Sequence, residues 1–104
     1  MHSLKYFSLL LIIINFLFFP VKSDTLFKDG KKIFLKKGRC VSCHTLDDAG
    51  SDGVIGPNLD LLELNKISII SAVTNGVGSM KGYKDKLTEG EMLAVSHYVF
   101  KSTN

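Results

Sequence analysis

The chain has 104 residues, of which 45% are hydrophobic, with 13 basic side chains, 10 acidic side chains and two cysteines. Without Lys5 and Lys22, which lie in an N-terminal apolar segment, 11 basic groups face 10 acidic ones, a net charge of +1. A balance so close to neutral does not indicate a nucleic-acid-binding protein.

Residues 1–23 have the layout of a secretory signal peptide. Lys5 precedes an apolar run over residues 6–19, and Pro20 follows shortly before the small residue Ser23. We predict export to the periplasm with cleavage after Ser23. The run is shorter than the roughly 20 residues that span a bilayer. The alternative is an uncleaved segment that anchors the protein on the periplasmic side.

Residues 24–104 form one small domain, which buries little apolar surface and needs a disulfide, metal or cofactor for stability. Helical periodicity covers residues 24–37, 65–76 and 87–102, with a shorter helix at 59–64. Glycine-rich loops separate these segments, and no stretch alternates as a strand does. The pattern predicts an all-α fold of three to four helices with long loops.

Each helix carries its own local signals. Gly38 is expected to end the first helix. Thr88 and Glu91 form the capping box that starts the last helix. Its expected apolar stripe is Met92, Val95 and Val99. The second helix is expected to bury a face made of Ile67, Ile70, Val73 and Thr74.

The stretch GRCVSCHTL, residues 38–46, holds both cysteines, three positions apart, with His44 directly after the second. A zinc site needs four ligands, a thioredoxin-like pair follows a strand, and a disulfide across so short a loop stabilises little. The spacing C-x-x-C-H is the attachment signature of c-type haem. We therefore predict one covalent haem c, with thioethers from Cys40 and Cys43 and with His44 as an iron ligand.

With this motif the chain resembles the small monohaem cytochromes c of bacteria, which share the mitochondrial-cytochrome-c-like fold. The resemblance covers Gly30 to Val99. GKKIF resembles the family's first helix, where Gly30 and Phe34 meet Tyr98 of the last helix.

Two further segments extend the resemblance. GPNL, residues 56–59, implies that the Pro57 carbonyl accepts a hydrogen bond from His44 and that Leu59 lies in the haem pocket. GVGSMKGY, residues 76–83, resembles the family's methionine loop.

The second axial ligand has three candidates in the sequence. Met80 lies in an irregular glycine-rich loop, Met92 belongs to the apolar stripe, and His97 is expected as a solvated surface residue. A bis-histidine site stays open on these grounds. The resemblance implies Met80, although Lys81 stands where many relatives have a proline.

Ligation by histidine and methionine favours ferrous iron and leaves no coordination position open. We therefore expect a monomeric one-electron carrier that is not an enzyme. Lys81, Lys84 and Lys86 flank the methionine loop and predict donor and acceptor proteins with acidic docking surfaces. One alternative is a sensor or redox-enzyme subunit whose sixth position is open or weakly held. Another is a thiol–disulfide oxidoreductase.

Overall fold

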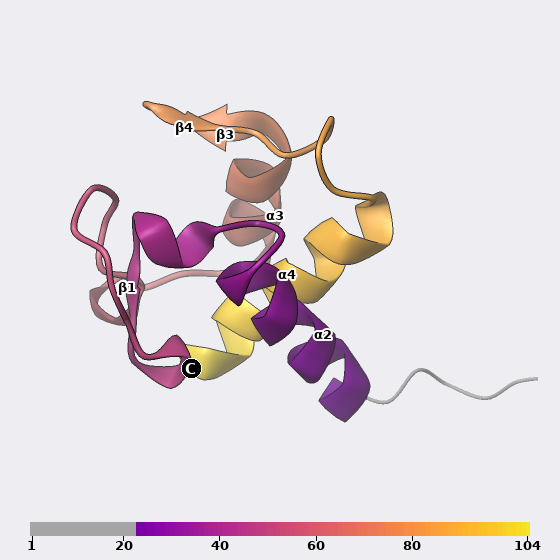
Figure 1. Ribbon diagram of the computed structural model, residues 1–104, viewed down its shortest axis with the longest axis horizontal. Coiled ribbons are helices and arrows are strands. Elements are labelled where there is room, and N and C mark those ends of the chain that lie inside the picture. The colour runs from indigo at the N-terminus through magenta and orange to yellow at the C-terminus, as the bar shows by residue number, and fades with distance from the viewer. Residues whose placement is uncertain (1–22) are drawn as a thin grey trace, which may run out of the picture.

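Three α-helices frame the structure, a computed structural model that describes residues 23–104. They are α2 (Ser23–Leu35), α3 (Lys66–Asn75) and α4 (Glu89–Ser102), and α4 packs against both others (Figure 1). The predicted export segment lies outside the described residues, apart from Ser23 at the start of α2. None of the helices described is long and apolar enough to cross a membrane.

Short elements connect the helices. Three 3-10 turns are η1 (Cys40–Ser42), η2 (Asp47–Ala49) and η3 (Leu59–Leu61). Two antiparallel hairpins pair β1 (Thr45–Leu46) with β2 (Ser51–Asp52), and β3 (Gly76–Val77) with β4 (Met80–Lys81). The expected all-α class is confirmed, because these strands have only two residues each.

The crossing of α2 and α4 depends on the smallest side chain. A Cβ atom at Gly30 would lie 2.6 Å from the Cβ of Tyr98, so only glycine allows this approach. The Tyr98 ring packs edge-on against Phe27 and Phe34, with ring centroids 4.9 and 5.6 Å apart. The predicted contact of Gly30 and Phe34 with Tyr98 is therefore confirmed.

The start of α4 follows the predicted capping box. Thr88 Oγ1 accepts a hydrogen bond from the Glu91 amide at 3.1 Å, and Glu91 Oε1 accepts one from the Thr88 amide at 2.9 Å. These bonds satisfy two backbone donors that the first turn of a helix leaves without partners. The predicted stripe of Met92, Val95 and Val99 is buried.

The face predicted for α3 is confirmed at Val73 and wrong at Ile67. Ile67 is 81% exposed, whereas Ile69 and Val73 are buried. The Asn65 side chain caps α3 by accepting a hydrogen bond from the Ser68 amide at 2.8 Å. Isoleucines on several sides of this helix allow more than one apolar face, and packing against α4 selects the face with Ile69 and Val73.

His97 is also placed differently from the prediction. It is 7% exposed, and its Nδ1 lies 3.3 Å from the Nζ of Lys66 on α3. The helix turns His97 towards α3 instead of solvent.

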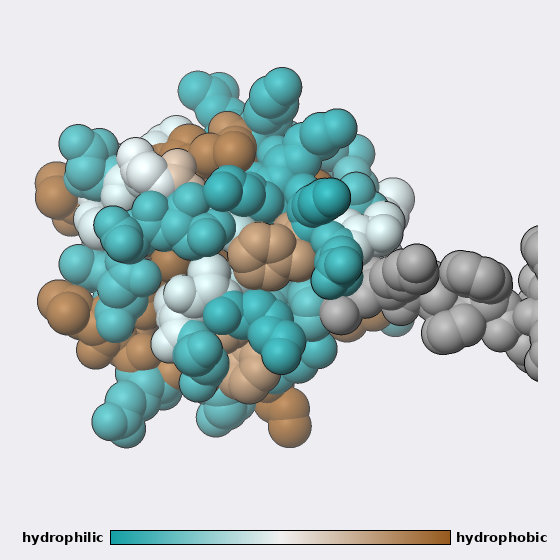
Figure 2. Space-filling model, turned by 90° about the horizontal axis from the view of Figure 1, so that it is seen from below, coloured by the Kyte–Doolittle hydropathy of each residue, from teal (hydrophilic) through white to brown (hydrophobic). Residues whose placement is uncertain are grey.

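On the face of the molecule shown in Figure 2, hydrophilic residues cover most of the surface, and apolar residues lie scattered between them.

Candidate functional site

The C-x-x-C-H segment forms a single tight turn that begins at Cys40, shortly after the end of α2 at Leu35. The amides of Cys43 and His44 both donate to the Cys40 carbonyl, at 3.2 and 3.0 Å. Since the turn is helical, it brings Cys40, Cys43 and His44 to the wall of one cavity. Within residues 23–104 neither thiol is in a disulfide, and both cysteines are half-buried.

The turn begins with an unusual backbone conformation. The predicted helix end at Gly38 differs in detail: α2 ends at Leu35, and the left-handed conformation falls on Arg39, with φ of 52°. Gly38 serves close packing instead, because a Cβ there would lie 3.0 Å from the Ile33 carbonyl oxygen and 3.2 Å from Cys40 Sγ. This packing fixes the segment from which Cys40 projects.

The raised pKa of the Cys40 thiol argues against a redox pair. Burial raises the pKa of Cys40 to about 11. The neighbouring Cys43 also raises this pKa, and a backbone hydrogen bond lowers it in part. Redox-active and nucleophilic cysteines have lowered pKa values, because the thiolate is the reacting species. The raised pKa of Cys40 is opposite to that pattern, and the element that precedes the motif is the helix α2 instead of the strand of a thioredoxin-like unit. Both observations disfavour the thiol–disulfide oxidoreductase alternative.

The His44 imidazole is held from two sides. Its Nδ1 lies 2.8 Å from the Pro57 carbonyl oxygen, and a carbonyl can only accept, so Nδ1 carries the proton. The Nε2 lone pair is then available to a metal. Gly56 lies against the ring, because a Cβ there would come within 2.6 Å of His44 Cε1. The Gly56 amide also donates to the Cys43 carbonyl at 2.7 Å.

A cavity of about 550 Å³ opens beside this turn. It falls within the usual range of cofactor pockets, roughly 300–1,000 Å³. Its walls come from α2, α3 and α4 and from the loops between them, and they are mainly apolar: Phe34, Leu59, Leu64, Ile69, Ala72, Val73, Val95 and Val99. Pro57 and Met80 line it as well, whereas Met92 and His97 lie outside its walls.

Met80 reaches the cavity from the β3–β4 hairpin. It pairs with Val77, and the turn between them has a positive φ of 56° at Gly78, while Gly76, at the start of β3, has a positive φ of 81°. Glycine adopts these conformations without the steric cost of a side chain. The hairpin thus brings a thioether to the cavity from a part of the chain distant from His44.

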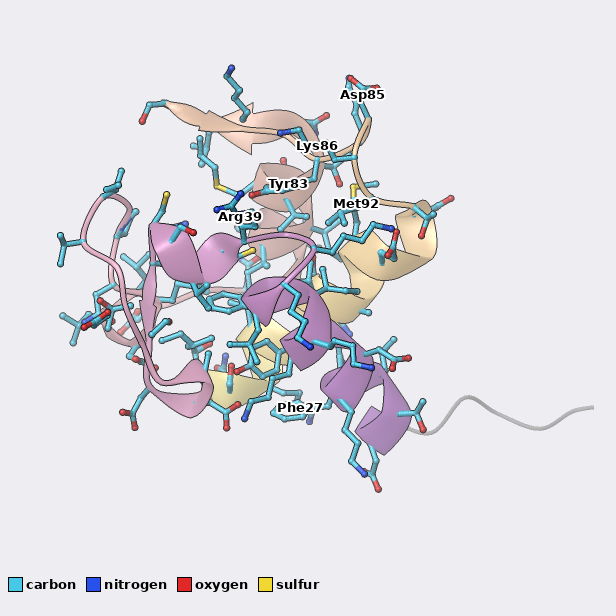
Figure 3. All side chains as sticks on the ribbon, in the orientation of Figure 1. Phe27, Arg39, Tyr83, Asp85, Lys86 and Met92 are labelled. Atoms are coloured by element: carbon cyan, nitrogen blue, oxygen red, sulfur yellow. The ribbon has the colours of Figure 1, made fainter. Side chains whose placement is uncertain are left out.

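Three cations stand at the mouth of the cavity, where Arg39, Lys81 and Lys86 all line the walls and are all exposed. We call these three residues the basic rim. In Figure 3, the labelled side chains of Arg39, Tyr83 and Lys86 lie in the space between the turn that leads to Cys40 and the chain that follows β4. Two exposed apolar side chains, Ile55 and Val77, also line the cavity. The sequence predicted Lys81, Lys84 and Lys86 near the methionine loop. In the structure Lys84 does not line the cavity, and Arg39 does.

Tyr83 makes a contact that the sequence did not indicate. Its hydroxyl donates to the Gly38 carbonyl at 2.6 Å, across 45 positions of the chain. Burial raises the pKa of Tyr83, so the phenol remains a donor at neutral pH. A local signal for this pairing does not exist, because the two residues meet only in the folded chain.

No group of three or more His, Cys, Asp or Glu side chains in residues 23–104 is arranged to hold a metal ion. The donors at the cavity are of another kind: two thiols, one imidazole and one thioether, from Cys40, Cys43, His44 and Met80. Imidazole and thioether are the axial ligands of haem iron in the cytochromes c.

Comparisons with known proteins give a consistent result. The family model described as cytochrome c oxidase, cbb3-type, subunit III matches residues 25–99. Cytochrome c6 of Cladophora glomerata is 34% identical over 84 residues, 72% of this chain and 87% of that protein. Cytochrome c6 of Bumilleriopsis filiformis is 31% identical, over 73% of this chain and 91% of its own length. The crystal structure of the c-type cytochrome SorU from Sinorhizobium meliloti aligns with a TM-score of 0.73 at 39% identity, covering 77% of this chain and 93% of SorU.

Proposed function

Because the chain belongs to the small monohaem cytochromes c, we propose that it carries electrons outside the cytoplasm with a haem whose axial ligands are His44 and Met80. The chain is a haem-based electron carrier, and its cofactor is covalently bound haem c with iron. The proposal adds the residues that hold the cofactor, the compartment and the surface that meets the partners.

The residues at the cavity suit this cofactor. Cys40 and Cys43 are one helical turn apart, which suits two thioether bonds to one ring, and the surrounding walls are mainly apolar. When bound, haem supplies an iron that alternates between the ferrous and ferric states. The observation that carries the proposal is the convergence of His44 and Met80, from separate segments, on one cavity.

The protein's own groups then set how the site behaves. The Pro57 carbonyl oxygen accepts a hydrogen bond from His44 Nδ1 at 2.8 Å, which orients the ring and leaves Nε2 for the metal. The Met80 thioether favours the ferrous state. With both positions taken by side chains, no position is left for a substrate. This is why we propose a carrier and not an enzyme.

The compartment follows from residues 1–23. Their layout is that of a secretory signal, and C-x-x-C-H sites receive haem outside the cytoplasm. We propose that the segment is removed after Ser23 and that the mature domain works in the periplasm. Retention of the segment as an anchor would keep the domain in the same compartment.

The basic rim is the proposed contact with redox partners. Arg39, Lys81 and Lys86 would attract an acidic surface, while Ile55 and Val77, 81% and 63% exposed, would be covered in the complex. Charge at the rim speeds encounter, and burial of the apolar side chains stabilises the contact once it has formed. Both features lie at the cavity that would hold the cofactor.

The decisive experiment is the absorption spectrum of the full chain, expressed with haem-attachment machinery, in both oxidation states and with carbon monoxide. A low-spin spectrum with the weak sulfur-to-iron charge-transfer band, unchanged by carbon monoxide, is expected. A high-spin spectrum or ready carbon monoxide binding would favour a sensor or enzyme subunit with an open sixth position. The mass of the exported protein would show one haem added and whether residues 1–23 were removed.

A further inference from the structure

The chain after Met80 is anchored to three parts of the fold through one residue. The Tyr83 amide donates to the Val73 carbonyl at the end of α3, at 2.8 Å. The Tyr83 carbonyl accepts from the amides of Lys86 and Leu87, at 2.9 and 2.8 Å. Its hydroxyl reaches the Gly38 carbonyl at 2.6 Å. Tyr83 therefore joins the methionine loop to the segment before Cys40.

The accepting side of this bond is rigid. Gly38 is buried, and its own amide donates to the Ile33 carbonyl at the end of α2, at 2.7 Å. The tight contacts that a Cβ at Gly38 would make with Ile33 and Cys40 show how closely the segment is packed. The Gly38 carbonyl is thus a fixed point two residues from Cys40.

The methionine side has weaker local support. Met80 belongs to a hairpin with two residues in each strand, and a pair of strands this short has little stability of its own. Lys81, the next residue, is exposed and lacks the fixed φ that a proline would supply. Two contacts hold this segment against the rest of the fold. Gly82 packs against the end of α3, where a Cβ would clash with the Thr74 carbonyl oxygen, and the Tyr83 hydroxyl bonds to Gly38.

We propose that the Tyr83 hydroxyl is a latch that keeps the Met80 loop closed over the cavity and holds the thioether on the iron. The proposal rests on the axial ligation proposed above. Tyr83 acts as a positioning residue, since it holds the loop and does not itself bind the metal. A single hydrogen bond of this kind shifts an opening equilibrium by about two- to ten-fold.

Replacement of Tyr83 by phenylalanine removes the bond and keeps the ring. A matched control is Tyr98→Phe, which also removes one tyrosine hydroxyl. That hydroxyl donates to Asp48 Oδ2 at 2.7 Å, away from the methionine loop. Both ferric holoproteins are titrated with imidazole, which competes for the sixth position, while the sulfur-to-iron charge-transfer band is followed. Thermal unfolding of each protein reports general stability.

We expect Tyr83→Phe to bind imidazole about five-fold more tightly than the wild type and to lose the band at correspondingly lower imidazole. Tyr98→Phe should unfold at a lower temperature with wild-type imidazole affinity. Equal affinity in Tyr83→Phe and wild type would overturn the latch, as would an equal increase in both variants. A wild-type protein without the band would refute the Met80 ligation itself, and the latch with it.

Discussion

The Pro57 carbonyl oxygen lies 2.8 Å from His44 Nδ1, and the glycine just before that proline lies against the same imidazole. Hydrogen bonding and close packing therefore act on one ring from one short loop. The ring cannot turn away from the cavity without breaking the bond or moving the loop. The two effects can be separated by changing the glycine alone.

Gly56→Ala should displace the imidazole, because the new Cβ would lie 2.6 Å from His44 Cε1. Overpacking of this kind costs about 1–3 kcal/mol. We expect a lower urea midpoint for the holoprotein and a changed iron spectrum. Gly90→Ala is the control, since beyond its chain neighbours and the backbone of its own helix the nearest atom to the added Cβ is Thr88 Oγ1, at 4.0 Å. Equal stability of the two variants would show that the loop yields without cost.

Met80→Leu should remove the sulfur ligand while keeping a side chain of similar volume. Loss of the charge-transfer band, carbon monoxide binding by the ferrous protein and a lower reduction potential are expected, because the thioether favours ferrous iron. Met92→Leu is matched to it, since Met92 is buried in α4 outside the cavity walls. That variant should keep the spectrum and lose less than about 1.5 kcal/mol of stability. A retained band in Met80→Leu would mean that another residue supplies the sulfur.

Lys86→Glu should slow the reaction of the reduced protein with ferricyanide, an anionic oxidant, and speed its reaction with a cationic cobalt(III) complex. The reason is that Lys86 lines the cavity mouth with Arg39 and Lys81, so its charge acts where we propose that the electron leaves. Changes on the order of several-fold are expected at low ionic strength, and salt should reduce them. Stopped-flow rates at two salt concentrations measure both effects.

Lys101→Glu provides the control for net charge. Lys101 is exposed in the last turn of α4 and takes no part in the cavity wall. Rates that change equally in both variants would show that overall charge, and not the basic rim, steers the oxidant.

The residues that could be predicted from sequence are those whose signals are local. The capping box of Thr88 and Glu91 spans one helical turn, and the cysteine motif spans five residues. Gly30 could be placed because it matched a family pattern. The errors and omissions lie where tertiary packing decides.

The exposed side of α3 and the burial of His97 illustrate this limit. Ile67 and Ile69 are equally apolar, so only the position of α4 and the cavity determines which is buried. His97 lies against Lys66, 31 positions away, and Tyr83 bonds to Gly38, 45 positions away. Such pairs leave no local pattern in the chain.

The pairing of Glu91 with Lys37 predicts how stability depends on pH. Lys37 Nζ lies 2.8 Å from Glu91 Oε2, and this bond, with that from the Thr88 amide, lowers the pKa of Glu91 below its usual value of 4.5. A carboxylate whose pKa is lower in the folded than in the unfolded state stabilises the folded protein at pH values above its unfolded-state pKa. This stabilisation disappears as the pH falls through the folded-state pKa.

Glu91→Gln keeps a side-chain acceptor for the Thr88 amide but removes the charge. We expect its urea midpoint to be lower than that of the wild type at pH 7, with the gap closing below about pH 4.5 and shrinking in high salt. A gap that stayed constant from pH 7 to pH 3 would assign the effect to packing at the helix start instead of to the ion pair.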